Sequence, residues 1–69
     1  MKLDLEDDGW IVTHDDGERE FFAFRGGAWR INRNGALGGQ TAGTLDEKIP
    51  RDRTRARRYV RSVRSQYMS

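Results

Sequence analysis

Three neighbouring side chains could do chemistry, because the only histidine, His14, is followed directly by the carboxylates Asp15 and Asp16. An imidazole beside carboxylates can ligate a metal ion or move a proton. The same residues, followed by Gly17, also form a strong β-turn sequence in which clustered acids are solvated. No further ligand and no serine–histidine–aspartate set can be assembled around them. We therefore expect a turn here, with no catalytic residue, no metal ligand and no cofactor.

A second segment with chemical potential is the glycine-rich stretch 34–44, NGALGGQTAGT. Glycine loops can cradle phosphate, but the lysine and serine or threonine that end a P-loop are missing here. A plain linker is the better interpretation. A chain of 69 residues also has little room for a closed, water-excluding pocket, so we expect neither an enzyme nor a small-molecule substrate.

The main functional signal is the stretch RDRTRARRYVRSVR, residues 51–64, which holds seven arginines and one acid. Arginine forms bidentate contacts with phosphates and carboxylates and stacks on aromatic rings. Arginines four residues apart on a helix repel each other by a few tenths of a kcal/mol, a cost that an anionic partner would remove. The stretch therefore indicates binding to nucleic acid or to an acidic protein surface. The candidate residues are Arg51, Arg55, Arg57, Arg58, Arg61 and Arg64.

The charges are unevenly distributed along the chain. Residues 1–20 hold eight acids against two bases, a balance of −6, and residues 21–69 hold eleven bases against three acids, a balance of +8. The acidic part could neutralise the arginines within the fold, or it could orient the binding of nucleic acid. A solvated helix face remains a further interpretation of the arginines. Cysteine is absent, the start MKLDLEDD is not a signal peptide, and no apolar run approaches the roughly 20 residues of a membrane span. These features fit a cytoplasmic protein that has no membrane partner.

Turn signals and β-prone residues predict a three-stranded antiparallel meander over about 9–15, 18–25 and 28–33. If Asp16-Gly17 and Gly26-Gly27 are two-residue turns, opposed residues share a face. One face then collects apolar side chains and forms the core: Ile11, Phe22, Phe24, Trp29 and Ile31. The other face collects Trp10, Val12 and Phe21 together with Arg19, Arg25 and Arg30.

A basic amphipathic helix is predicted over 45–67. Thr44 and Glu47 form a capping-box pattern, and Pro50 suits a start near residue 50. An apolar stripe follows the helical period and can cover the sheet: Ile49, Ala56, Val60, Val63 and Tyr67. We thus expect one α+β domain of two layers, βββα, with an acidic arm (1–8), a sheet (9–33), a glycine-rich linker (34–44) and the helix.

The open sheet face is a second candidate surface, because Trp10 and Phe21 are interleaved there with three arginines. Aromatic rings beside arginines can stack on bases and bind phosphates. Over about residues 9–66, this arrangement resembles the architecture of plant and phage-integrase DNA-binding modules, which insert a three-stranded sheet into the major groove. The alternative is that the N-terminal arm or the glycine loop covers the rings with leucine side chains, Leu3, Leu5 or Leu37.

The preferred hypothesis is a small non-catalytic protein that binds DNA or RNA through the arginine helix, the sheet face, or both. The alternative is a phage-type inhibitor or adaptor that binds a host nucleic-acid-processing protein, such as a CRISPR effector or a polymerase. Self-association of acidic and basic surfaces is a third possibility, and the sequence leaves the oligomeric state open.

Overall fold

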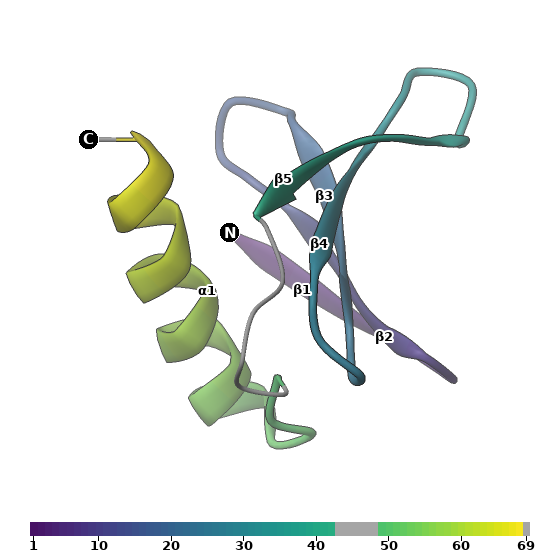
Figure 1. Ribbon diagram of the computed structural model, residues 1–69. Coiled ribbons are helices and arrows are strands. Elements are labelled where there is room, and N and C mark those ends of the chain that lie inside the picture. Colours follow the sequence, from purple (N-terminus) through teal and green to yellow (C-terminus); the bar gives the residue numbers. More distant parts are fainter. Residues whose placement is uncertain (43–48, 69) are drawn as a thin grey trace.

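Five antiparallel strands form one sheet, and a C-terminal helix covers one of its faces (Figure 1). The computed structural model describes residues 1–42 and 49–68. Neighbouring strands in the sheet are also neighbours in sequence, in the order β1-β2-β3-β4-β5. The predicted α+β class is confirmed, whereas the sheet has five strands and not the expected three. The elements are β1 (Lys2–Glu6), β2 (Gly9–Thr13), β3 (Arg19–Ala23), β4 (Ala28–Ile31), β5 (Leu37–Ala42) and α1 (Arg53–Met68).

The two additional strands come from segments that were expected to be an arm and a linker. β1 contains two acids and a lysine, and β5 contains Gly38 and Gly39. Acidic residues and glycine disfavour strands, so neither segment has a strong strand signal. Both strands lie at the edges of the sheet, where each pairs on one side only and where charged residues are tolerated. Pairing with β2 and β4 therefore overrides their local preference.

The last three hairpins use one and the same five-residue loop. The amide of the first residue donates to the carbonyl of the fifth, and the amide of the fourth, a glycine, donates back to the carbonyl of the first. The glycine has a positive φ of 84° to 104° in each case. This is a turn followed by a residue in the left-handed conformation, which inserts one extra residue into the strand. The loops run from His14 to Glu18, from Ala23 to Gly27 and from Asn32 to Ala36.

Because of these loops, the observed strand register differs from the predicted one. A two-residue turn at Asp16-Gly17 would need a positive φ at Asp16, but among the described residues only glycines have one. As a result, Val12 lies opposite Glu20 and not opposite Phe21.

The second hairpin is displaced in the same sense, because Phe22 lies opposite Ala28 and not opposite Ile31. Both displacements are by an odd number of residues, so each turns a whole strand over. The prediction therefore placed Phe22 on the correct face of the sheet, but it exchanged the two faces of β2 and of β4.

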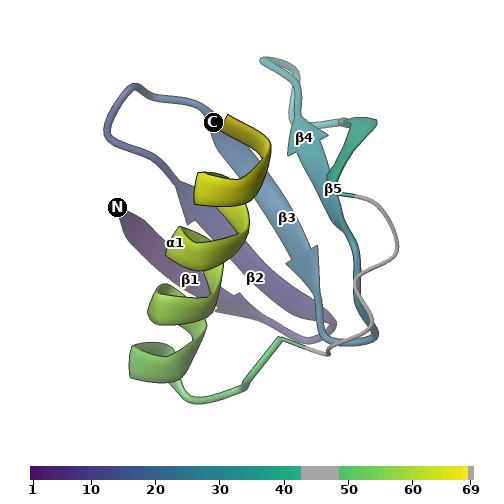
Figure 2. The same cartoon turned by 60° about the vertical axis from the view of Figure 1, so that its left-hand side comes forward.

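The core lies between the sheet and α1. The strands contribute Trp10, Val12 and Phe22, which are at most 1% exposed. Figure 2 shows α1 in front of the sheet, and the predicted helical stripe of Ile49, Ala56, Val60 and Val63 is buried against these strands. The side chain of Tyr67 and the expected capping box at 44–47 lie outside the described residues. Within the part of the chain that the structure describes, no helix is long and apolar enough to cross a membrane.

Candidate nucleic-acid interface

Helix α1 holds its arginines in a fixed orientation. Its first turn is capped by Asp52, whose Oδ2 accepts from the amide of Arg55 over 2.9 Å and whose carbonyl accepts from the amide of Ala56 over 2.8 Å. The apolar stripe, with Ala56 and Val60 fully buried, sets the rotation of the helix about its axis. The arginines of α1 lie off this stripe, and most of them are exposed.

On the outward side of α1, Arg53, Arg57, Arg58 and Arg61 surround a hollow of about 300 Å³ together with the hydroxyl-bearing Thr54. Arg57 is half-buried, and its Nε is buried without a hydrogen-bond partner among the described residues. Arg58 and Arg61 are exposed, and an anionic oxygen that enters the hollow can accept hydrogen bonds from their guanidinium groups. We name these five residues the arginine hollow.

Two arginines at the start of the helix are fixed by aromatic rings. The Cζ atom of Arg51 lies 4.1 Å from the centre of the Phe24 ring, and that of Arg53 lies 5.7 Å from the Trp10 ring. Guanidinium groups over aromatic faces are attracted by the ring quadrupole and keep their charge and donors available at the edge. The base of the helix thus presents pre-oriented cations.

The far end of the helix is neutralised within the fold. Arg64 Nη2 lies 3.1 Å from Asp16 Oδ2, and Nη1 lies 3.8 Å from Glu20 Oε1. The Glu18 amide that donates to the Asp16 carboxylate, more than the nearby Arg64, holds the pKa of Asp16 below its usual value. Of the two roles that the sequence left open for the acidic part of the chain, neutralisation within the fold is seen at Arg64.

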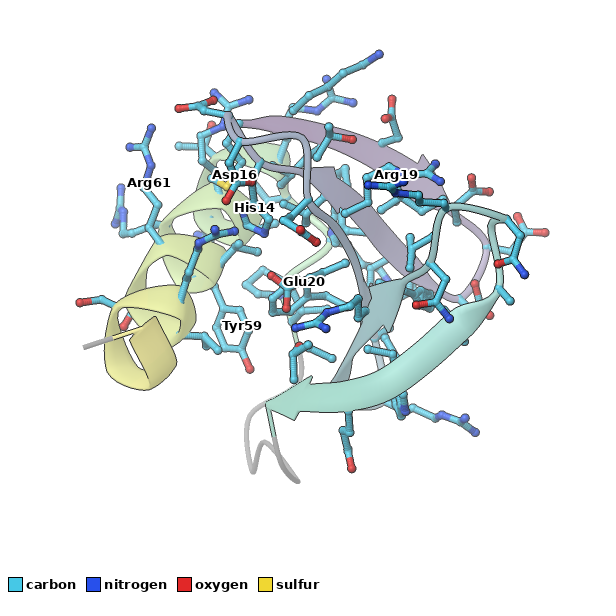
Figure 3. The ribbon with its side chains drawn as sticks, turned by 90° about the horizontal axis from the view of Figure 1, so that it is seen from above. His14, Asp16, Arg19, Glu20, Tyr59 and Arg61 are labelled. Carbon is cyan, nitrogen blue, oxygen red and sulfur yellow. The ribbon has the colours of Figure 1, made fainter. Side chains whose placement is uncertain are left out.

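A buried polar cluster at this end was not anticipated from the sequence. His14 Nε2 donates to Glu20 Oε1 over 2.7 Å, and Thr41 Oγ1 donates to Glu20 Oε2. Figure 3 shows Glu20 and His14 on the side of the sheet that faces α1, whereas Arg19 points away from the helix. The His14 and Glu20 side chains are 5% and 7% exposed, so this is an interior polar contact and not a solvated turn.

The face of the sheet opposite α1 is the second surface. Phe21, Trp29 and Leu37 line an open groove of about 530 Å³ there, with Arg25 and Arg51 at its margin. Phe21 and Arg19 lie on this face, as predicted.

The prediction that Trp10 lies on the open face is wrong, because the register shift places Trp10 in the core. There its Nε1 donates to the carbonyl of Pro50 over 2.9 Å. The prediction that Arg30 lies on the open face is also wrong, because Arg30 on β4 lies opposite Glu20 on β3. Arg30 and Arg64 line a hollow of about 200 Å³ near the Glu20 carboxylate.

The predicted residues therefore divide into separate groups. Arg57, Arg58 and Arg61 come together at the arginine hollow, while Arg51 and Arg25 meet at the opposite groove. Among the side chains that the structure describes, no group of three or more acidic or histidine residues is arranged to hold a metal ion. Comparison with protein-family models, curated proteins and solved structures finds no match to this chain, so its function has to be argued from its own residues.

Proposed function

We propose that this chain is a small non-catalytic protein that binds nucleic acid, with the arginine hollow of α1 contacting the phosphate backbone. The observation that supports the proposal is the hollow itself. Four arginine side chains and a threonine line one hollow on a helix that packs against the core. Within the described residues, none of these arginines has a carboxylate within salt-bridge distance.

Such a surface contacts phosphates and contributes little information about base sequence, because backbone contacts position a protein without reading bases. Each phosphate that the helix neutralises releases condensed counterions, so affinity should fall steeply as salt rises. The proposal thus predicts binding with a defined salt slope.

The test is fluorescence anisotropy with labelled duplex and single-stranded oligonucleotides over a series of salt concentrations. The double variant Arg58→Gln/Arg61→Gln should weaken binding to every probe and reduce the salt slope by about two, because two phosphate contacts are lost. The matched control is Lys2→Gln/Arg33→Gln, which removes the same charge from exposed residues outside the hollow. Equal losses in both double variants would show a diffuse charge effect and contradict the proposal, as would absence of binding at low salt.

An acidic protein surface is the second candidate partner, for an inhibitor or adaptor role. Guanidinium groups bind carboxylates as well as phosphates, as Arg64 does with Asp16 and Glu20 within the fold. Affinity capture from a host lysate, with and without nuclease, separates the two. A partner retained after nuclease treatment, together with absence of oligonucleotide binding, would favour the protein partner over nucleic acid.

A further inference from the structure

We infer that the groove opposite α1 binds one unstacked base of a single-stranded nucleic acid, while Arg25 and Arg51 bind the adjoining phosphates. This inference rests on the proposed function and deepens it, because it makes single strands the preferred substrate. The groove has a volume of about 530 Å³, which falls within the roughly 300–1,000 Å³ of small-ligand pockets.

The floor of the groove offers a stacking platform. Phe21 and Trp29 are directly opposite each other on β3 and β4, with ring centroids 6.4 Å apart and planes inclined by 35°. The Trp29 ring packs on Gly27, where an added Cβ would lie only 2.8 Å from the indole Cη2. The ring therefore has a fixed position and a half-exposed surface. Aromatic platforms of this kind bind bases of any sequence through their π-faces.

One wall of the groove is basic and connects the groove with the helix. Arg25 is exposed in the β3–β4 loop, and Arg51 is held over Phe24 just before α1 begins. Arg53, the second residue after Arg51, already belongs to the arginine hollow. A backbone that passes Arg51 can therefore continue along the helix, which joins this groove to the surface already proposed for phosphates.

Acidic side chains also line the groove. Asp7 and Asp8 form the β1–β2 turn, and this turn is held against the β3–β4 loop by a 2.9 Å hydrogen bond from the Phe24 amide to the Asp8 carbonyl. Carboxylates repel phosphate and accept hydrogen bonds from base amino groups, as at the N4 of cytosine. We expect the phosphates to contact Arg25 and Arg51 and the base amino groups to contact the aspartates. An apolar peptide would leave both the arginines and the aspartates of the groove unpaired, which favours a nucleotide as the occupant.

The test compares a short single strand with its matched duplex. Trp29→Ala should weaken single-strand binding about tenfold or more, the usual effect of losing one stacked base, and leave duplex binding unchanged. Trp29→Phe should retain most of the affinity, because it keeps an aromatic face. Binding should also quench tryptophan fluorescence, and the quenching should be lost in Trp29→Phe, since the only other tryptophan, Trp10, is 1% exposed.

A second, milder pair of variants tests the same groove in case Trp29→Ala fails to fold. Leu37 in the groove and Leu5 on β1 are each 57% exposed, so Leu37→Ser and Leu5→Ser remove equivalent surface leucines. Only Leu37→Ser should weaken single-strand binding. If Trp29→Ala and Leu37→Ser bind normally while the Arg58/Arg61 variant does not, this inference is refuted and the proposed function stands. If the Arg58/Arg61 variant also binds normally, the proposed function fails as well.

Discussion

Replacing Glu20 with glutamine should destabilise the fold through a single charge. The Glu20 carboxylate is 7% exposed and accepts from His14 Nε2 and Thr41 Oγ1. Hydrogen bonds to a charged group contribute about 1.5–3 kcal/mol each, against about 0.5–1.5 kcal/mol for neutral pairs. Losing this difference at two bonds costs about 2 kcal/mol. A chain of 69 residues has a free energy of unfolding of roughly 3–10 kcal/mol, so the loss is a large fraction of the total.

Urea unfolding at neutral pH, followed by circular dichroism, measures this effect. With an m-value of about 1 kcal/mol/M for so small a domain, the Glu20→Gln midpoint should fall by about 2 M. Glu18→Gln is the matched control, because it makes the same change at an exposed position two residues away and should alter stability by less than about 0.5 kcal/mol. Equal midpoints for the two variants, or a higher midpoint for Glu20→Gln, would show that desolvation of the carboxylate outweighs its hydrogen bonds, and would refute the reasoning.

Three further predictions concern the framework. Gly9→Ala should cost about 2 kcal/mol or more in chemical denaturation, because its Cβ would lie 2.2 Å from a carbonyl oxygen of β3, whereas Gly39→Ala meets nothing within 4 Å and should be tolerated. Asp52→Ala should cost about 1 kcal/mol by loss of the helix cap, measured as a lower thermal midpoint, and an unchanged midpoint would mean that the cap contributes nothing. The pKa of Asp16 should lie below the ordinary aspartate value of about 3.9 in a carboxyl NMR titration, because the Glu18 amide and then Arg64 favour its charged form. Its contribution to stability is then present above the unfolded pKa and is lost as pH falls through the folded pKa; an unshifted titration would contradict this.

The helix and its buried stripe could be predicted from the sequence because the period of Ala56, Val60 and Val63 is local information. The faces of the sheet could not, because they depend on how many residues each loop takes up. An aspartate–glycine pair fits both a two-residue turn and a five-residue loop whose fourth residue is a left-handed glycine. The choice of the longer loop at Gly17, Gly26 and Gly35 moves Trp10 into the core and Trp29 to the open face. The nine-residue spacing of these glycines is the sequence feature that could have shown that the three loops are alike.

The role of Glu20 was hidden for a different reason. In sequence it is one more acid in an acidic segment, and the predicted register put it opposite Thr13, beside the turn, where an acid is usually solvated. The correct register puts it between Val12 and Arg30, on the face covered by the helix. A buried acid needs partners from distant parts of the chain, here Thr41 and Arg64, and no local pattern reveals such partners.

The arginines of α1 do not form one uniform surface, and their differences indicate where a polyanion would lie. Arg64 is paired with carboxylates, and Arg61 lies close enough to Asp15 to help lower the pKa of that side chain, after the larger effect of the N-terminal ammonium group. Charge is thus compensated near the end of the helix that meets the β2–β3 loop. At its beginning, Arg51 and Arg53 stack on rings, an arrangement that fixes the cations without neutralising them. The path of least electrostatic cost for a polyanion therefore starts at Arg57 and Arg58 in the arginine hollow. It leads past Arg51 into the groove on the opposite face, which is the route that the single-strand inference requires.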